Sequence, residues 1–215
     1  MIRRLIRYLA HEHGRAVGLY KKLCKPGGRE WAEYLRRRGV LYHLGADCSI
    51  LPSAHLDDPV YTWIGDRVCL GSCTLICHDG AVEMLYQRYG QKLDRVAPII
   101  VKDDVFIGEG AMVLGGTTIG EGSIIGAGAV LRRSVPAGSV VMGNPAKVVA
   151  KVEDLLRFWE AETLDLPWAD LIAAREGAFD ASMEEELIRR RQEHFFKSDP
   201  RATIAPRPAT RGATG

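Results

Sequence analysis

The residues of this chain best suited to move a proton are its histidines, at His11, His13, His43, His55, His78 and His194. A histidine titrates near neutrality and can take the proton of a hydroxyl group that attacks an electrophile. His78 differs from the others by its position, because it lies where a regular repeat stops and a charged segment begins. This position singles out His78 among the six, and we regard His43 and His55 as structural or substrate-side residues.

The cysteines do not form a recognisable redox or metal motif. There are five, at Cys24, Cys48, Cys69, Cys73 and Cys77, and the basic start of the chain is too polar for a signal-peptide core, so a disulfide framework is not expected. Zinc sites usually combine a C-x2-C pair with a second pair of ligands, and this pattern is lacking. We interpret the cysteines as small packing residues and predict no metal.

The elements that must position His78 are indicated by a six-residue repeat. Aliphatic residues recur at this interval at Val101, Ile107, Val113, Ile119, Ile125 and Leu131. Neither a helix nor a simple strand has this period. A fixed hexad is typical of a parallel β-helix, in which each hexad forms one flat side of a coil. The sequence therefore predicts an all-β core in which three hexads, or 18 residues, make one coil.

A second set of hexads precedes the first, at Ile64, Leu70 and Ile76, after an imperfect coil that contains Ile50 and Leu56. Between the two sets, residues 79–98 have no hexad and carry charges and tyrosines. We predict that they form an excursion loop, within a β-helix domain that spans residues 42–150.

The interior of the coils is expected to hold two kinds of residue. The aliphatic hexad positions point inward and stack on their counterparts 18 residues later. Two positions before them lie mostly small residues, Val105, Ala111, Thr117, Ser123 and Ala129, which suit a tight corner. Burial of an Ile or Val is worth roughly 1.5–3 kcal/mol. Ile119→Asp is therefore expected to unfold the domain.

Helices are predicted on both sides of the repeats. Residues 1–41 read as an N-terminal helical cap, with Ile2, Leu5, Ile6 and Leu9 on one face of its first helix. This basic amphipathic start is compatible with an anionic membrane surface, but we favour a cap, because a solenoid needs its end covered. Residues 151–198 are predicted to contain further helices, and residues 199–215 a disordered tail.

The overall composition limits the classes of function. The net charge is only +2 over 215 residues, which gives no indication of nucleic-acid binding. No apolar run approaches the roughly 20 residues of a transmembrane helix. We therefore expect a cytoplasmic protein.

A specific motif ends the repeat region: Ile125-Gly-Ala-Gly-Ala-Val-Leu131, then Val135-Pro136, then Gly143-Asn-Pro-Ala-Lys-Val-Val149. It resembles the end of the hexapeptide-repeat acyltransferases, and is most similar to the branch of maltose, galactoside and surface-polysaccharide O-acetyltransferases. The resemblance covers about residues 42–150. It implies a left-handed parallel β-helix, a homotrimer with active sites between subunits, and acetyl-CoA as cosubstrate in the groove between two subunits.

The resemblance also implies roles for individual residues. His78 is in the place of the family's catalytic histidine and would deprotonate the acceptor hydroxyl, while Asp79 would orient His78 or bind substrate. Glu109 and Ala127, one coil apart, are in positions that face the pantetheine arm. Basic residues are in positions near the phosphates of the cofactor, at Arg132, Arg133 and Lys147.

Residues outside these motifs are candidates for acceptor binding. Tyr86, Arg88 and Tyr89 in the excursion loop have side chains that can stack on a sugar or form hydrogen bonds with it, and loops on a rigid scaffold often carry specificity. An equally good interpretation is that they pack the loop on a neighbouring subunit.

The function expected from this resemblance is O-acetylation of a sugar or a surface-polysaccharide precursor. Alternatives are N-acetylation of a nucleotide amino sugar, O-acetylation of serine, and a non-catalytic β-helix scaffold. A γ-type carbonic anhydrase, which shares the fold, needs three histidines around zinc. The coils after His78 contain no histidine, so we discount that enzyme.

Overall fold

The computed structural model describes residues 2–197, and the chain divides into two compact units between residues 156 and 157. The tail for which disorder was predicted, residues 199–215, lies outside the described residues. Among the described residues, no helix is both long and apolar enough to cross a membrane.

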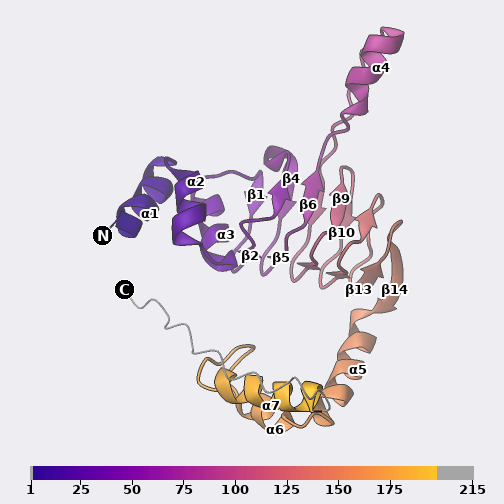
Figure 1. Cartoon of the computed structure of the whole chain (residues 1–215). Helices are drawn as coiled ribbons and strands as arrows, with labels where there is room; N and C mark the ends of the chain where they lie inside the picture. Colours follow the sequence, from indigo (N-terminus) through magenta and orange to yellow (C-terminus); the bar gives the residue numbers. More distant parts are fainter. Residues whose placement is uncertain (1, 198–215) are drawn as a thin grey trace. The chain divides into compact units, whose positions relative to one another are not determined.

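The first unit contains short strands that are stacked in successive coils (Figure 1). Sheet A consists of β1 (His43–Leu44), β4 (Thr62–Ile64), β7 (Ile99–Val101) and β10 (Thr118–Ile119). Sheet B consists of β2 (Ser49–Ile50), β5 (Cys69–Leu70), β8 (Phe106–Ile107), β11 (Ile124–Ile125), β13 (Ser139–Met142) and β14 (Lys147–Lys151). Sheet C consists of β3 (His55–Leu56), β6 (Thr74–Ile76), β9 (Met112–Leu114) and β12 (Val130–Leu131).

The chain visits the three sheets in the order A, B, C and then returns to A in the next coil. The paired strands are parallel, apart from the antiparallel pair β13–β14. Ile107 pairs with Ile125, and Val113 pairs with Leu131, so that one coil takes 18 residues here. The predicted parallel β-helix is confirmed in this respect.

The hexad positions form the core of the coils. Val101, Ile107, Val113, Ile119 and Ile125 are fully buried, and the small residues two positions earlier are buried as well. Ser123 satisfies its hydroxyl group by donating to the carbonyl of Pro136. Thr117, in the equivalent position of the preceding hexad, has a buried Oγ1 that finds no hydrogen-bond partner within residues 2–197.

The repeat shifts by one residue in β6, where the sequence-based prediction was wrong in detail. Leu75 is buried and pairs with Leu56 and Val113, whereas Ile76 is only half-buried. The corner before β6 has three residues, 71–73, and the matching corner of the next coil has four, 108–111. Because side chains alternate along a strand, the shift turns Cys77 into the core and His78 outward.

The predicted excursion loop contains a helix, α4 (Ala81–Tyr89), which sequence analysis missed. The two ends of the excursion pair with each other, since His78 and Val96 form an antiparallel bridge and the Ala97 N–H donates to the Cys77 carbonyl. Figure 1 shows α4 on the part of the excursion beyond these paired ends, and none of its residues is buried.

The N-terminal helices pack on the first coil. They are α1 (Ile2–His13), α2 (Val17–Leu19), the π-helical turn η1 (Tyr20–Cys24) and α3 (Gly28–Arg37). Trp31, Tyr34 and Leu35 of α3 belong to the same buried cluster as Ile50 of β2. A methyl group on Gly28 would lie 2.3 Å from Ser49 Oγ, so a larger residue at this position would force that hydroxyl group to move.

The second unit contains most of α5 (Val152–Leu164), together with α6 (Ala169–Ala174) and α7 (Glu184–Phe196). Its centre is formed by Trp168 and Leu187, which are buried. The ring of Trp168 meets His194 and Phe195 edge to face. An ion pair joins Arg190 of α7 to Asp170 of α6 at 2.8 Å.

Candidate active site

The corners between sheets align along the β-helix as three edges. The C–A edge, where the chain passes from sheet C to sheet A, contains residues 57–58, 77–78, 115–117 and 132–134 in successive coils. The B–C edge, where it passes from sheet B to sheet C, contains residues 51–54, 71–73, 108–111, 126–129 and 143–146. The predicted catalytic and cofactor residues lie on or directly after these two edges, whereas the predicted acceptor residues lie on α4.

His78 is oriented by a carboxylate from the preceding coil. Its Nδ1 lies 2.5 Å from Oδ2 of Asp58, and its side chain remains 43% exposed. Asp58 directly precedes the short 3-10 helix η2 (Pro59–Tyr61), so its position on the C–A edge is set where the first coil turns into β4. When the ring is neutral, Nδ1–H donates to Asp58 and Nε2 carries the lone pair that can accept a proton.

The electrostatic surroundings of His78 favour its protonated form. The hydrogen bond that His78 donates to Asp58 and the charge of that carboxylate raise the pKa of His78 above its ordinary value, and Asp57 and Asp79 add smaller contributions in the same direction. A histidine with a raised pKa is a stronger base once it has lost its proton.

Asp79, which was predicted to orient His78 or bind substrate, has another contact. Its Oδ1 accepts a hydrogen bond from the N–H of Ala81 at 3.0 Å, at the first residue of α4. The side chain that holds His78 Nδ1 is Asp58, which sequence analysis did not select.

Asp58 belongs to a small cluster of ionisable groups. Ligand atoms of Asp57, Asp58 and His78 all lie within 4.8 Å of one another, and His55 Nε2 is 3.4 Å from Asp57 Oδ1. These atoms are of a kind that binds a divalent cation. The cluster is accessible to water. Its shortest contact is the hydrogen bond between Asp58 and His78, which already engages His78 Nδ1, the nitrogen that would otherwise face a cation.

Arg132 and Arg133 lie on the same edge as His78. They follow β12, two coils after the strand β6 that precedes His78, and both are exposed. Neighbouring coils are about 4.8 Å apart, which puts the two arginines about 10 Å from His78 along the axis. The C–A edge therefore offers a proton acceptor at one level and two cations at another.

Glu109, Ala127 and Lys147 lie on or next to the B–C edge. The N–H of Gly128 donates to the carbonyl of Glu109, which confirms that Glu109 and Ala127 stack one coil apart. The Glu109 carboxylate accepts a hydrogen bond from the N–H of Ser72 at 3.1 Å. Lys147 begins β14, directly after this edge in the last coil. The predicted cofactor residues are thus divided between two edges of one chain.

The predicted acceptor residues are all on α4. Arg88 Nε donates to the hydroxyl group of Tyr89 at 2.9 Å, and the guanidinium group lies over the Tyr89 ring. Tyr86 and Tyr89 are exposed. The structure brings these two tyrosines and Arg88 together on one helix, and no contact joins them to His78.

An aromatic hollow, which was not predicted, is lined by several residues that are close in sequence to the His78 site. It has a volume of about 400 Å³ and is lined by Tyr42, Val60, Tyr61, Trp63, Pro98, Ile100 and Lys102. Val60 and Tyr61 follow Asp58 after Pro59, and Pro98 ends the excursion that begins after His78. The Trp63 ring is stacked on His43, and Lys102 Nζ lies 5.0 Å from its centre.

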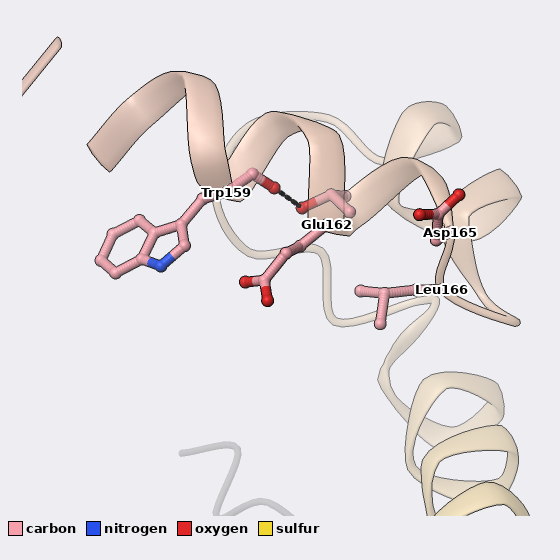
Figure 2. A pocket seen from close by; sticks show the side chains of 5 residues that line it. Trp159, Glu162, Asp165 and Leu166 are labelled. Atoms are coloured by element: carbon pink, nitrogen blue, oxygen red, sulfur yellow. Dashed lines mark hydrogen bonds between the residues drawn. The ribbon is translucent and has the colours of Figure 1, made fainter. Parts of the chain in front are cut away.

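A second hollow, of about 420 Å³, is in the unit after residue 156 (Figure 2). It is lined by Trp159, Glu162, Thr163, Asp165 and Leu166, and Thr163 Oγ1 donates to the Trp159 carbonyl. Its two carboxylates would repel a ligand that carries phosphate groups. For this reason the edge with Arg132 and Arg133 is the better candidate for a nucleotide.

Comparison with known proteins identifies the repeats. Residues 98–133 match the family model described as bacterial transferase hexapeptide (six repeats). A segment of 99 residues is 38% identical to "Putative acetyltransferase" of Schizosaccharomyces pombe, and covers 46% of this chain and 47% of that protein. A segment of 59 residues is 46% identical to 2,3,4,5-tetrahydropyridine-2,6-dicarboxylate N-acetyltransferase of Staphylococcus aureus, and covers 27% of this chain and 25% of that enzyme. The matches span less than half the length of these relatives.

Among solved structures, a maltose O-acetyltransferase from Clostridium difficile is 20% identical, with a TM-score of 0.45, and the match covers 61% of this chain and 95% of that one. A hexapeptide-repeat acetyltransferase from Vibrio cholerae is 22% identical, with a TM-score of 0.45, and covers 61% and 98%. The resemblance to hexapeptide-repeat transferases that the terminal motif indicated is confirmed by the family model and by relatives that are named acetyltransferases.

Proposed function

We propose that this chain is an acetyltransferase that uses acetyl-CoA to acetylate a hydroxyl group of a sugar or of a surface-polysaccharide precursor. The observation that carries the proposal is the contact between Asp58 and His78 on an edge of hexapeptide coils that also presents Arg132 and Arg133. Relatives named acetyltransferases support the reaction class.

The proposed reaction begins with proton transfer to His78. Nε2 takes the proton of the acceptor hydroxyl group while its oxygen attacks the acetyl carbonyl of the thioester. Asp58 holds the ring in the tautomer that leaves Nε2 free and stabilises the imidazolium that forms. The carbon–sulfur bond then breaks, the CoA thiolate takes up the proton from His78, and the products are an acetyl ester and free CoA.

Acetyl-CoA is proposed to lie along the C–A edge, with its thioester near His78 and its phosphates near Arg132 and Arg133. Arginine suits this role because its planar group can form two charge-assisted hydrogen bonds with a phosphate. Glu109, Ala127 and Lys147 are on the other edge of the same chain. The division supports a site that is completed by a neighbouring copy, in a homotrimer of left-handed β-helices of the kind that the resemblance implies.

The acceptor is proposed to bind near α4 and the aromatic hollow. Tyr86, Arg88 and Tyr89 remain candidates for acceptor contacts, although they are equally suited to pack α4 on a neighbouring copy. Tyr61 of the aromatic hollow follows closely after Asp58 in the chain, and aromatic rings provide apolar surface for the faces of a sugar ring.

One specific observation favours an amine acceptor as a second candidate. The Staphylococcus aureus relative with 46% identity is named an N-acetyltransferase. O-acetylation and N-acetylation can be distinguished by their products, because mild alkali cleaves an acetyl ester and leaves an acetamide intact. An acceptor screen that includes sugars, serine and amino sugars, with alkali treatment of each product, decides between them.

The proposal is tested by release of the CoA thiol in the presence of acetyl-CoA and the panel of acceptors, with EDTA present throughout. We expect turnover for at least one acceptor, a loss of about 10²–10⁴-fold in His78→Ala, and little change in His55→Ala. His55 is a good control because it belongs to the same exposed cluster. Failure of the wild-type chain to bind acetyl-CoA would leave a non-catalytic scaffold as the better account.

A further inference from the structure

The N-terminal helices carry a surface that the proposed function does not use. Residues 2–29 contain eight lysine and arginine residues and a single acidic residue, Glu12, which gives a formal charge of +7. The whole chain has a net charge of +2, so the other residues together carry −5. Such a separation of charge within one chain is typical of a protein with an anionic partner.

Large apolar side chains are exposed on the same helices. Ile2, Leu5 and Tyr8 are 70%, 55% and 55% exposed, and they recur every three residues, so they form one stripe along α1. Ile6 and Ala10, on the adjoining stripe, are buried and attach α1 to the rest of the unit. The exposed stripe is therefore additional to the face that α1 uses for packing.

The adjacent α2, which ends at Leu19, and η1, which contains Leu23, extend this apolar surface. Leu19 and Leu23 are 51% and 41% exposed. Cys24 Sγ donates to the Arg3 carbonyl at 3.5 Å, so the end of η1 lies beside the start of α1. This contact places Leu23 near the end of α1 that holds Ile2.

Several cations of this surface are available to a partner. Arg7 is used internally, because it pairs at 2.8 Å with Glu30, which also accepts a hydrogen bond from the buried Tyr20 hydroxyl group. Arg4, Lys22 and Lys25 have no ion-pair partner within residues 2–197, and all three are exposed. Helices that lie in a membrane interface have this composition, with Lys and Arg next to exposed Leu, Ile and Tyr.

We propose that α1 and η1 bind the surface of an anionic lipid bilayer, with Ile2, Leu5, Tyr8 and Leu23 inserted among the acyl chains and Arg4, Lys22 and Lys25 next to the headgroups. The apolar side chains distinguish this partner from a nucleic acid. Phosphate contacts on a nucleic-acid duplex are made by cations, and they do not require exposed leucines. The inference is independent of the proposed acetyltransferase activity.

The test is flotation of the full chain with vesicles of phosphatidylcholine alone and of phosphatidylcholine mixed with about one third phosphatidylglycerol. We expect flotation with the mixed vesicles only. Lys22→Gln should lower the partition coefficient about fivefold, since one cation near an anionic surface is worth about 1 kcal/mol. Leu5→Gln should also lower it several-fold, because it removes inserted apolar area.

Matched control variants test whether vesicle binding depends on the surface of α1 and η1. Leu156 is 54% exposed, close to the value of Leu5, so Leu156→Gln should leave flotation unchanged, as should Lys92→Gln in the excursion. Absence of flotation with the mixed vesicles would overturn the proposal, and so would equal loss in the control variants. Binding to a duplex oligonucleotide that depends on Lys22 and not on Leu5, without flotation, would assign the charge to nucleic acid instead.

Discussion

Asp58 Oδ2 lies 2.5 Å from His78 Nδ1, although the two residues are 20 positions apart in the chain. The reason is the coil, which returns to the C–A edge after about this number of residues. A carboxylate that is remote in sequence is thereby fixed against the ring, while the adjacent Asp79 accepts a hydrogen bond from the start of α4.

The pH dependence of kcat/KM should reflect the effect of the Asp58 carboxylate on the pKa of His78. A general base must be neutral, and Asp58 raises the pKa of His78, so kcat/KM should increase with pH through a midpoint above the ordinary histidine value of about 6.5. Asp58→Asn should shift this midpoint to lower pH and lower the high-pH rate by at least about tenfold, because the ring loses its orienting partner.

The control for this experiment is Asp79→Asn. Its charge adds only a minor contribution to the pKa of His78, so the midpoint should move much less than in Asp58→Asn. If the two variants shifted the midpoint equally, Asp58 would not be the residue that tunes the base.

Removal of the cation at Arg133 should weaken binding of the donor. Charge-assisted hydrogen bonds contribute about 1.5–3 kcal/mol, so Arg133→Ala should raise the KM for acetyl-CoA about 10- to 100-fold, with a small effect on kcat. The steady-state constants of Lys22→Ala, an exposed cation on the N-terminal helices, serve as the reference. An unchanged KM in Arg133→Ala would remove this arginine from the donor site.

The two faces of β11 should differ in their contribution to stability. Ile125 is fully buried, and Ile125→Ala should lower the free energy of unfolding by about 2–5 kcal/mol. Ile124 is the preceding residue and is only half-buried on the outer face, so Ile124→Ala should have a much smaller effect. Denaturant unfolding of both variants measures the difference, and equal losses would contradict the inward assignment of the hexad positions.

Thr117 and Ser123 provide a second matched pair. Thr117 Oγ1 is buried and has no hydrogen-bond partner among the residues that the structure describes, so Thr117→Val should raise the free energy of unfolding by about 1 kcal/mol. Ser123 Oγ donates to the Pro136 carbonyl and accepts from the Ser139 N–H, so Ser123→Ala should lower it by about 1–3 kcal/mol. A destabilised Thr117→Val would indicate that its hydroxyl group has a partner after all.

The hexads from Val101 to Leu131 predicted the coils closely, because successive inward-pointing residues remain six positions apart throughout this stretch. The prediction failed at Ile76, since the corner at residues 71–73 is one residue shorter and moves Leu75 into the core. A single missing residue is difficult to recognise from periodicity alone.

The candidate site was predicted only in part. His78 was selected because it lies where the repeat stops, in the place of the catalytic histidine of the family that the motif resembles, but its carboxylate partner was expected next to it in sequence. Residues 57–59 directly follow Leu56 of the imperfect coil, and no role was predicted for them. A signal was nevertheless present, because Asp58 precedes His78 by about one coil length. The aromatic hollow brings Tyr42, Trp63 and Lys102 together from three coils, and no local pattern indicates such an assembly.

The most direct test of the central claim combines acetyl-CoA calorimetry with turnover in wild type, His78→Ala and His55→Ala. The account predicts that all three variants bind acetyl-CoA with similar affinity and that only His78→Ala loses turnover, by about 10²–10⁴-fold. Full turnover in His78→Ala would contradict the assignment of His78 as the base. Absence of acetyl-CoA binding in the wild-type chain would contradict the acetyltransferase function itself.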